Sequence, residues 1–287
     1  MDKITLSSVS YVYSKDTPFE TSALNRVSVS FEQGRVTGVI GHTGSGKSTL
    51  VGMLNGLIRP TEGKVLLDGK DIWEKPKEIR SVRFRVGLVM QYPEYQLFDE
   101  TVEKDIGFGP RNMGLSEDEV RLRVREAMDF VRLPVSLLSR SPFELSGGQK
   151  RRVAIAGVVA MRPEVLVLDE PAAGLDPRGK EEILGGLKEY LSFGDKTVIL
   201  VSHSMEDMAR HCDNIVVMNR GEVLKSGSVS EVFSYSDELQ RVGLDIPEVS
   251  RIALALKERG YCLDGELYTV LGVKNALLSL LGKGGVR

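Results

Sequence analysis

The sequence predicts an α/β fold, in which helices cover a sheet of mostly parallel strands. Compact apolar segments at 35–41 (RVTGVIG), 164–171 (EVLVLDEP) and 197–203 (TVILVSH) are typical of buried strands. Helical patterns lie between them, at 47–58 and near 177–192. Because strands and helices alternate in this way, we expect a parallel sheet with helices packed on it.

Further strands are expected beside this sheet. Apolar and polar side chains alternate in ITLSSVSYVY (4–13) and ALNRVSVSFEQG (23–34), which predicts half-exposed antiparallel strands. KVLLDG (64–69) and FRVGLVMQ (84–91) are two more strand candidates. NIVVMNRGEVLKSG (214–227) predicts a β-hairpin, because a turn-forming Arg-Gly separates two apolar runs.

Two regions depart from the sheet pattern. From about 100 to 163 helical character dominates, which predicts a helical subdomain inserted into the sheet domain. After about 235 the signals weaken. This last part contains a helical run at 247–260 (PEVSRIALALKERG), a short hairpin-like stretch at 261–270 (YCLDGELYTV) and a last helix at 273–282 (VKNALLSLLG).

The 287 residues suit one large α/β domain with an appendage, and we divide them into a main domain (1–230) and a C-terminal extension (231–287). The net charge of −2 does not favour broad nucleic-acid binding. Cys212 and Cys262 fit no metal-binding spacing, and we expect buried thiols in a reduced, cytosolic setting. The N-terminus lacks the apolar core of a leader, and the longest apolar run (153–161) is far shorter than the roughly 18 residues that span a bilayer.

A phosphate-binding loop is predicted at 41–49 (GHTGSGKST), between an apolar strand and a helix. Its defining positions are filled by Gly41, Gly46, Lys47 and Ser48. The glycines let backbone N–H groups converge on phosphate oxygens, and the helix N-terminus adds a positive dipole end. Lys47 supplies a charge toward the β- and γ-phosphates, and the Ser48 hydroxyl suits Mg²⁺. The loop predicts a nucleotide site.

VLVLDEP at 165–171 predicts the metal and base side of the same site. An apolar strand ends at Asp169, where phosphate-loop ATPases hold Mg²⁺ with an aspartate. The adjacent Glu170 is placed to polarise an attacking water as a general base. Together the two carboxylates predict ATP hydrolysis.

A second anion site is predicted at LSGGQ, residues 145–149. A capping serine and two glycines leave bare backbone N–H groups at a helix N-terminus, with no metal ligand beside them. Because this stretch belongs to the helical block, one chain does not easily bring it to its own phosphate loop. Two chains packed head to tail would let each LSGGQ close the loop of the other.

Over roughly residues 1–230 these stretches resemble the ATP-binding cassette (ABC) family. GHTGSGKS resembles the Walker A motif, LSGGQ the signature and VLVLDEP the Walker B motif. Gln91 follows a strand as the Q-loop glutamine of the family does, AGLD at 173–176 resembles the D-loop, and His203 stands at the switch-histidine position.

The resemblance implies a role for each matching residue. His203 would contact the γ-phosphate and hold Glu170 and the water, and Gln91 would touch the metal while sensing a transporter partner. Tyr13 resembles the aromatic residue that stacks on adenine, although Tyr11 lies on the same strand face and competes for that role. The implied catalytic residues are Lys47, Gln91, Glu170 and His203. The implied nucleotide-binding residues are Tyr13, Gly41, Thr43, Gly44, Ser45, Gly46, Lys47, Ser48, Thr49, Ser146, Gly148 and Gln149, and the implied Mg²⁺ ligands are Ser48, Gln91 and Asp169.

Within the family the sequence resembles the second of two paralogous ATPases of energy-coupling factor (ECF) transporters, which import vitamins and metal ions. The stretches that carry this resemblance are QYPEYQLF at 91–98, ETVEKDIGFGPRNMGL at 100–115 and SPFELSGGQKRRVAIAGVVAMRPEVLVLDEPAAGLDP at 141–177. The stretch at 230–260 (SEVFSYSDELQRVGLDIPEVSRIALALKERG) also resembles the extension that packs two such ATPases together. The implied partners are a second ATPase subunit, a transmembrane scaffold (T) subunit and a substrate-binding membrane (S) subunit. The implied location is the cytoplasmic face of the cell membrane.

The segment 91–98 is an expected docking groove for a helix of the scaffold subunit. Its aromatic and apolar side chains suit a helix-in-groove contact, and they are Tyr92, Pro93, Tyr95, Leu97 and Phe98. Packing between the two subdomains is the alternative explanation for the same residues.

Three other functions remain open from the sequence. One is a conventional ABC importer ATPase, and another is a non-transport ABC ATPase that acts on DNA or ribosomes. The third is a regulatory subunit with little turnover, which Glu170 and His203 disfavour. Both a homomeric and a heteromeric dimer remain open, and the resemblance implies that a separate membrane protein binds the cargo.

Overall fold

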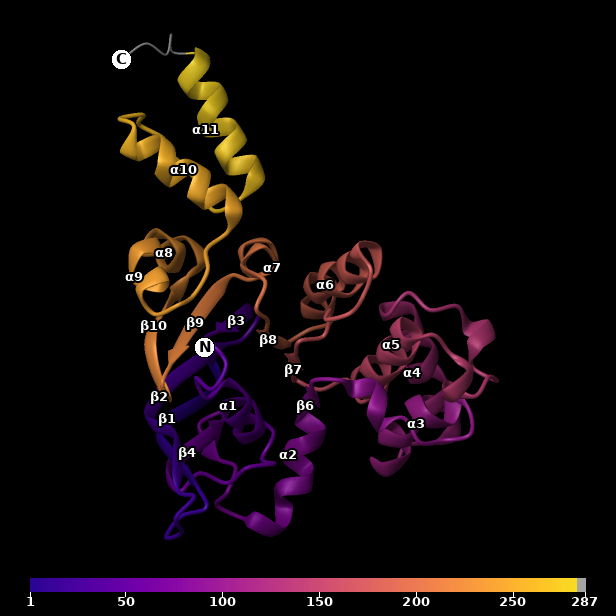
Figure 1. Ribbon diagram of the computed structural model, residues 1–287. Helices are drawn as coiled ribbons and strands as arrows, with labels where there is room; N and C mark the ends of the chain where they lie inside the picture. Colours follow the sequence, from indigo (N-terminus) through magenta and orange to yellow (C-terminus); the bar gives the residue numbers. More distant parts are fainter. Residues whose placement is uncertain (283–287) are drawn as a thin grey trace.

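The computed structural model describes residues 1–282, without the side chains of residues 236, 237 and 282, and it contains two β-sheets (Figure 1). The strands are β1 (Asp2–Tyr13), β2 (Thr21–Glu32), β3 (Val36–Ile40), β4 (Glu62–Leu67), β5 (Lys70–Asp71), β6 (Val86–Val89), β7 (Val165–Asp169), β8 (Thr197–Val201), β9 (Asn214–Asn219) and β10 (Glu222–Ser228). The α-helices are α1 (Lys47–Leu54), α2 (Ile79–Arg85), α3 (Val102–Asn112), α4 (Glu117–Phe130), α5 (Gly147–Val159), α6 (Pro177–Ser192), α7 (Met205–His211), α8 (Val229–Ser234), α9 (Ser236–Arg241), α10 (Glu248–Glu258) and α11 (Val270–Gly282). Short 3₁₀ turns are η1 (Pro76–Glu78), η2 (Pro93–Gln96), η3 (Val135–Leu137) and η4 (Pro142–Glu144).

The larger sheet has the strand order β10-β9-β3-β8-β7-β6. Strands β9, β3, β8, β7 and β6 run parallel, and β10 pairs antiparallel with β9. The smaller sheet has the order β2-β1-β4-β5 and is antiparallel throughout. The predicted α/β class, the parallel core, the antiparallel N-terminal strands and the hairpin at 214–227 are therefore confirmed.

The parallel sheet separates two apolar cores, because successive side chains of a strand point to opposite faces. On one face Val36 and Ile40 pack with residues of the helices α3 to α7. On the other face Val39 packs with α1 and with the antiparallel sheet. Every residue of β3 and β8 is buried, which explains their continuous apolar sequences.

The helices of residues 102–159 gather beside the β6 edge of the parallel sheet (Figure 1). Each of these three helices begins at a hydroxyl cap: Thr101 accepts from Lys104 N, Ser116 from Glu119 N, and Ser146 from Gln149 N. Their apolar faces join the first of the two cores.

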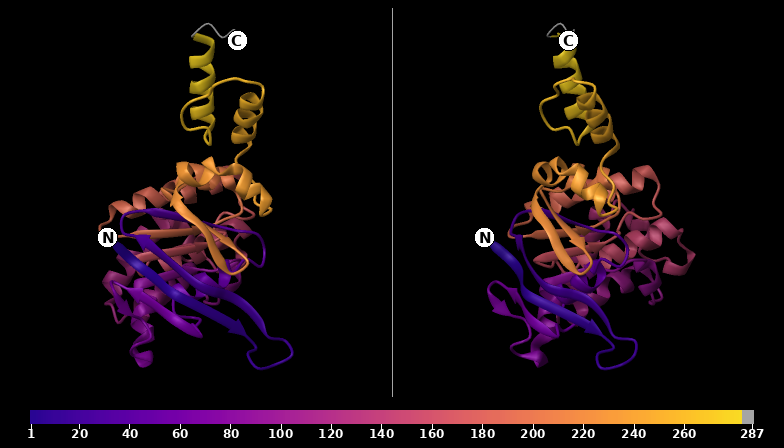
Figure 2. Two further views of the ribbon diagram at one scale, coloured as in Figure 1. Left: turned by 90° about the vertical axis from the view of Figure 1, so that its left-hand side faces the viewer. Right: turned by 60° about the vertical axis from the view of Figure 1, so that its left-hand side comes forward.

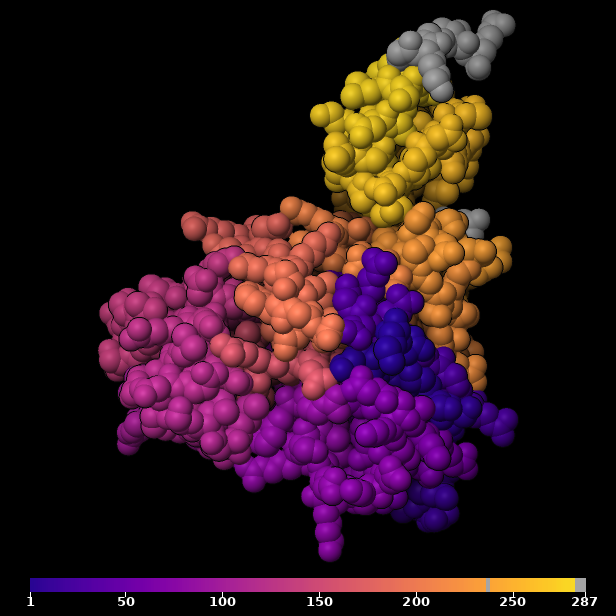
Figure 3. Space-filling model, turned by 180° about the vertical axis from the view of Figure 1, so that it is seen from behind, coloured from indigo at the N-terminus to yellow at the C-terminus, as the bar shows by residue number. Residues whose placement is uncertain are grey.

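Helices α10 and α11 stand away from the sheets as a separate lobe (Figures 2 and 3). The lobe has a small apolar core of its own, made by Ala253, Leu263, Val273 and Ala276. The division of the chain at residue 230 stays a prediction. Among residues 1–282 no helix is long and apolar enough to cross a membrane.

Two local predictions are wrong. The hairpin-like segment 261–270 forms no strand and packs against α10 instead. Leu263 packs into the small core, and Ser250 Oγ of α10 donates to Leu267 O at 3.0 Å. Cys262 is exposed, whereas Cys212 is partly buried and burial raises the pKa of its thiol.

The other departures concern element ends. Residues 84 and 85 end α2 and do not belong to strand β6. The first helix ends at Leu54 and not at residue 58, because Gly56 takes a left-handed φ of 69° that breaks it.

Candidate functional site

The loop between β3 and α1 has a backbone that only glycine can supply at Gly46. Its φ is 101°, and a Cβ atom there would lie 2.7 Å from Ala23 O and from Leu24 Cδ2 of β2. Gly44 also has a positive φ, of 80°. These two glycines let the loop curl over the N-terminus of α1 and press against the antiparallel sheet.

Lys47 is buried at the start of α1, with its ammonium inside the loop. Its Nζ donates to Gly41 O at 2.6 Å and to His42 O at 3.0 Å. Burial lowers the pKa of Lys47, while the nearby carboxylates Asp169 and Glu170 oppose that shift. The loop therefore holds a positive charge in position before any anion is bound.

A cavity of about 380 Å³ opens above this loop. It is lined by Tyr13, Thr21, Ser22, Ala23, Thr43, Gly44, Gly46, Lys47, Ser48, Thr49, Gln91, Asp169, Glu170 and His203. Six separate segments of the chain meet here, four of them at the carboxyl ends of β3, β6, β7 and β8. This edge is where open α/β sheets bind their ligands.

Asp169 is the last residue of β7 and Glu170 follows it directly, and the protein environment disfavours the negative charge of both. The pKa of Glu170 is raised to about 7, mainly by burial and secondly by the negative charge of Asp169 beside it. Burial also raises the pKa of Asp169, although Lys47 opposes it. Glu170 Oε1 is buried and has no hydrogen-bond partner among the described residues. A carboxyl with a pKa near neutrality suits a general base.

The backbone at Glu170 is in a left-handed conformation, with a φ of 52°. This conformation is uncommon for a non-glycine residue and recurs at functional sites. It follows directly after the extended strand, and Glu170 N donates to Val201 O of β8 at 3.0 Å. The turn aims the carboxylate into the cavity.

His203 follows β8 and lies opposite Glu170. Its Nε2 is 3.6 Å from Glu170 Oε1, which is too long for a hydrogen bond. Partial burial and the charge of Lys47 lower the pKa of His203, so the ring is mainly neutral at pH 7. A neutral imidazole can donate from one nitrogen and accept at the other.

The two tyrosines of β1 have different surroundings. Tyr13 lines the cavity, is 41% exposed and shares a hydrogen bond of 3.1 Å with Thr49 Oγ1. Tyr11 meets Tyr13 edge to face at 4.7 Å and packs against the core beneath the antiparallel sheet. The geometry favours Tyr13 as the aromatic wall of the site.

Oxygen donors of the kind that Mg²⁺ prefers face the same cavity. They are the exposed hydroxyl of Ser48, the amide of Gln91 and the carboxylate of Asp169. Residues 1–282 contain no group of three or more His, Cys, Asp or Glu side chains that could hold a metal alone. A hard cation here would need further oxygens, such as those of phosphates.

Sequence reasoning missed Thr21, Ser22 and Ala23 of β2, which line the cavity. Thr21 lies opposite Tyr13 in the antiparallel register, so strand pairing from Tyr13 was the signal that could have found them. Of the expected residues, Gly41 and Ser45 lie behind the lining. Gly41 accepts from Lys47, and Ser45 is buried with an Oγ that lacks a partner in the described structure.

The segment 145–149 is not among the described residues that line the cavity. At the N-terminus of α5, Ser146 Oγ accepts from Gln149 N at 3.4 Å, and Ser146 N donates to Gln149 Oε1 at 3.0 Å. This capping box shapes the turn and leaves Ser146 exposed. A Cβ atom on Gly148 would be 3.4 Å from Leu175 of the segment before α6. The structure thus separates Ser146, Gly148 and Gln149 from the phosphate loop.

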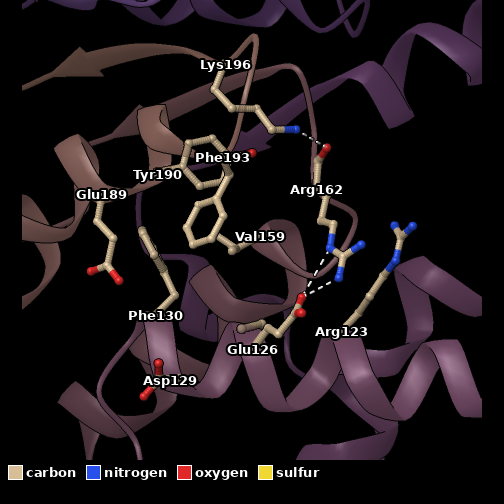
Figure 4. Close-up of a pocket in the computed structure, with 11 residues that line it drawn as sticks. Arg123, Glu126, Asp129, Phe130, Val159, Arg162, Glu189, Tyr190, Phe193 and Lys196 are labelled. Carbon is tan, nitrogen blue, oxygen red and sulfur yellow. Dashed lines mark hydrogen bonds and ion pairs between the residues drawn. The ribbon is translucent and has the colours of Figure 1, made fainter.

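A larger cavity of about 440 Å³ lies between α4, the end of α5 and the end of α6 (Figure 4). Its charged groups are mostly satisfied within the protein: Arg162 binds Glu126, and Lys196 Nζ donates to the carbonyls of Arg162 and Pro163. It contains no glycine-rich loop and no pair of adjacent carboxylates. The smaller cavity is therefore the candidate site for nucleotide chemistry.

Comparison with known proteins gives the same picture. The family model described as "ABC transporter" matches residues 24–173. The energy-coupling factor transporter ATP-binding protein EcfA2 of Caldanaerobacter subterraneus subsp. tengcongensis is 50% identical over 278 residues, covering 97% of each chain. The protein of the same name from Clostridium acetobutylicum is 50% identical over 279 residues, covering 97% of this chain and 98% of the relative.

Solved structures of cassette proteins are also similar. CbiO1 from Clostridium perfringens, described as part of the ABC transporter complex cbiONQ, superposes with a TM-score of 0.74 at 38% identity and covers 89% of this chain and 99% of that chain. The dimeric cassette MJ0796, in a post-hydrolysis state with ADP and Pi, gives a TM-score of 0.72 at 28% identity, covering 79% and 98%. Together with the matched motifs, these similarities confirm the resemblance seen in the sequence. The chain belongs to the ABC transporter family, in its group of energy-coupling factor transporter ATP-binding proteins.

Proposed function

We propose that this chain hydrolyses ATP in sites shared between two ATPase subunits and so powers an ECF-type importer of a vitamin or metal ion. One observation carries the proposal: the cavity combines a phosphate loop with Asp169 and Glu170, while the LSGGQ segment lies outside it. A second cassette in head-to-tail orientation would supply that missing segment, with Ser146 and Gly148 contacting the γ-phosphate and Gln149 maintaining the turn.

In this mechanism the chain mainly positions the reactants and stabilises charge. Lys47 and the N–H groups of the loop bind the β- and γ-phosphates, and Tyr13 stacks on the adenine. Glu170 accepts a proton from the attacking water, for which its pKa of about 7 is suited. His203 bridges Glu170 and the γ-phosphate, because its ring is neutral and faces that carboxylate.

Mg²⁺ fits the oxygen donors of the cavity. Ser48 and Asp169 would hold it together with phosphate oxygens, and Gln91 would approach it from the end of β6. When bound, the ion neutralises charge on the phosphates. Asp169 has its pKa raised by burial, so a cation beside it would favour its ionised form.

The membrane partner would dock beside the segment that follows Gln91. A hollow of about 280 Å³ lies between this segment, α3 and α5. Two exposed aromatic side chains line it, Phe98 (58% exposed) and Phe108 (48% exposed), and Tyr95 of the same segment as Phe98 is 84% exposed. Pro93 and Leu97 are buried, so these two members of the expected surface belong to the packing between subdomains. A helix of the scaffold (T) subunit suits this groove.

The C-terminal lobe offers a second contact. Apolar residues of α11 face solvent in the described chain, and they are Val270, Leu271, Leu278 and Leu281. An exposed apolar helix face of this kind marks an interaction site, and a second ATPase subunit would cover it. The chain would then sit peripherally at the cytoplasmic face of the cell membrane, bound to scaffold (T) and substrate-binding (S) subunits and to no nucleic acid.

Size-exclusion chromatography of the Glu170→Gln variant tests this proposal. With ATP and Mg²⁺ the variant should elute as a dimer, because nucleotide is bound between subunits but not cleaved. With ADP it should elute as a monomer, and adding Lys47→Ala should abolish the ATP effect. A variant that stays monomeric with saturating ATP would contradict the shared site.

A further inference from the structure

Glu94 and Arg151 form a buried ion pair that the chemistry described so far does not use. The guanidinium of Arg151 binds the carboxylate of Glu94 with both ends of its fork, at 3.0 Å from Nε and 3.1 Å from Nη2. The side chain of Arg151 is only 5% exposed and that of Glu94 20%. The ring of Tyr92 lies 5.8 Å from the guanidinium carbon and covers it.

The pair joins two segments that are 57 residues apart in sequence. Glu94 belongs to η2, three residues after Gln91, which lines the nucleotide cavity of its own chain. Arg151 lies in the first turns of α5, two residues after Gln149 of the LSGGQ segment. A bidentate pair fixes both distance and angle, so η2 and the start of α5 are held as one unit.

In a head-to-tail dimer these two segments serve different ATP molecules. Gln91 would face the ATP bound by its own phosphate loop, whereas LSGGQ would close on the ATP of the other subunit. We propose that Glu94 is a positioning residue for the partner subunit's ATP site: through Arg151 it fixes the start of α5 at the orientation needed to complete that site. This inference rests on the shared-site arrangement of the proposed function.

The chemistry of the pair supports a positioning role. The planar guanidinium of Arg151 donates two hydrogen bonds to the carboxylate of Glu94. The single ammonium of a lysine would not reproduce this two-point geometry. Removing either partner of a buried pair leaves the other charge uncompensated. The remaining side chain would then have to move, and the start of α5 would move with it. A small misplacement of groups around a reacting phosphate is enough to lower a rate by about tenfold or more.

The experiment uses mixed dimers in which only one ATP site can turn over. An active chain with Glu170 intact is held at a concentration too low for it to self-associate. A partner chain carrying Glu170→Gln is then added in excess, and Pi release is measured. The observed rate reports the active chain's phosphate loop closed by the partner's LSGGQ segment.

Glu94→Gln is placed first in the partner chain and then in the active chain. We expect the saturated rate to fall about tenfold when the variant is in the partner and less than twofold when it is in the active chain. Arg151→Met in the partner should give the same loss, and the double variant no further loss, because the two residues act through one contact. Arg151→Lys should recover part of the rate.

The controls separate this role from folding and from the proposed function. Glu100→Gln removes the carboxylate of an exposed pair with Lys104 on the same subdomain and should leave the rate unchanged. A folding defect would lower the rate in either placement, and thermal unfolding of each variant checks it. If an unmodified Glu170→Gln partner gives no stimulation, the shared site and this inference both fail. If that partner stimulates and Glu94→Gln within it stimulates equally, or if the loss appears only in the active chain, the inference alone is overturned.

Discussion

Replacing Glu170 with glutamine should make the nucleotide-free protein more stable, and the gain should depend on pH. Glu170 is ionised with difficulty in the folded protein, because it is buried beside Asp169 and its Oε1 has no hydrogen-bond partner in the described structure. Its pKa is raised from 4.5 to about 7. The folded protein therefore binds a proton more tightly than the unfolded chain, and that stabilisation is fully present below pH 4.5 and lost as the pH rises to about 7.

The size of the effect follows from this raised pKa. A change from 4.5 to about 7 corresponds to about 3.4 kcal/mol at 1.36 kcal/mol per pKa unit. The side chain is 14% exposed, so water screens part of this cost and we expect about 2–3 kcal/mol. Glutamine is neutral at every pH, so it avoids the loss. In a domain of this size such a difference corresponds to roughly 5–10 °C in Tm.

The assay is thermal unfolding of wild type and Glu170→Gln without nucleotide, from pH 5 to pH 8.5. The two melting temperatures should be closest at pH 5 and should separate as the pH rises toward 7.5, with the variant higher. Glu258→Gln, on the exposed side of α10, controls for the loss of one carboxylate. A Tm difference that is the same at pH 5 and pH 8 would refute the account of Glu170 as a strained, desolvated base.

Three further results are expected. Tyr13→Ala should weaken ATP binding, measured by fluorescent-nucleotide displacement, by about tenfold through loss of roughly 1–3 kcal/mol of stacking, and Tyr11→Ala should weaken it much less. Gly46→Ala should lower the Tm and abolish nucleotide binding, because its φ of 101° costs a side chain about 1–3 kcal/mol and the Cβ meets β2; normal binding would contradict the loop geometry. Leu278→Lys with Leu281→Lys should leave the Tm of the main domain unchanged and weaken dimerisation in analytical ultracentrifugation, and unaltered dimerisation would show that α11 is not a contact.

Local pattern was sufficient to predict the parts of the site that are continuous in sequence. The phosphate loop and the Asp169–Glu170 turn each follow a buried strand directly. The apolar run predicts the strand, and the residues after it must therefore lie at the carboxyl end of that strand. The antiparallel strands and the last hairpin were predictable for the same reason. The lining by Thr21 and the pair of Glu94 with Arg151 depend on tertiary packing, which a single sequence does not reveal.

The errors have the same origin. The segment at 261–270 has the alternation of a hairpin, but its apolar residues find partners in α8 and α10, and Tyr268 lies 6.1 Å from Phe233. Cys262 was expected to be buried because cysteine usually is, yet it is exposed and does not belong to the small C-terminal core. The separation of LSGGQ from the phosphate loop was predicted correctly, because membership in a different subdomain is visible in the sequence.

The central claim is that two subunits share each ATP site, and the dependence of steady-state hydrolysis on protein concentration tests it most directly. The rate per subunit of the wild type should rise with concentration and level off as dimers form. The same series with Glu170→Gln should show no turnover while its ATP-bound dimer persists. A rate per subunit that is independent of concentration, from a protein that remains monomeric throughout, would contradict the claim.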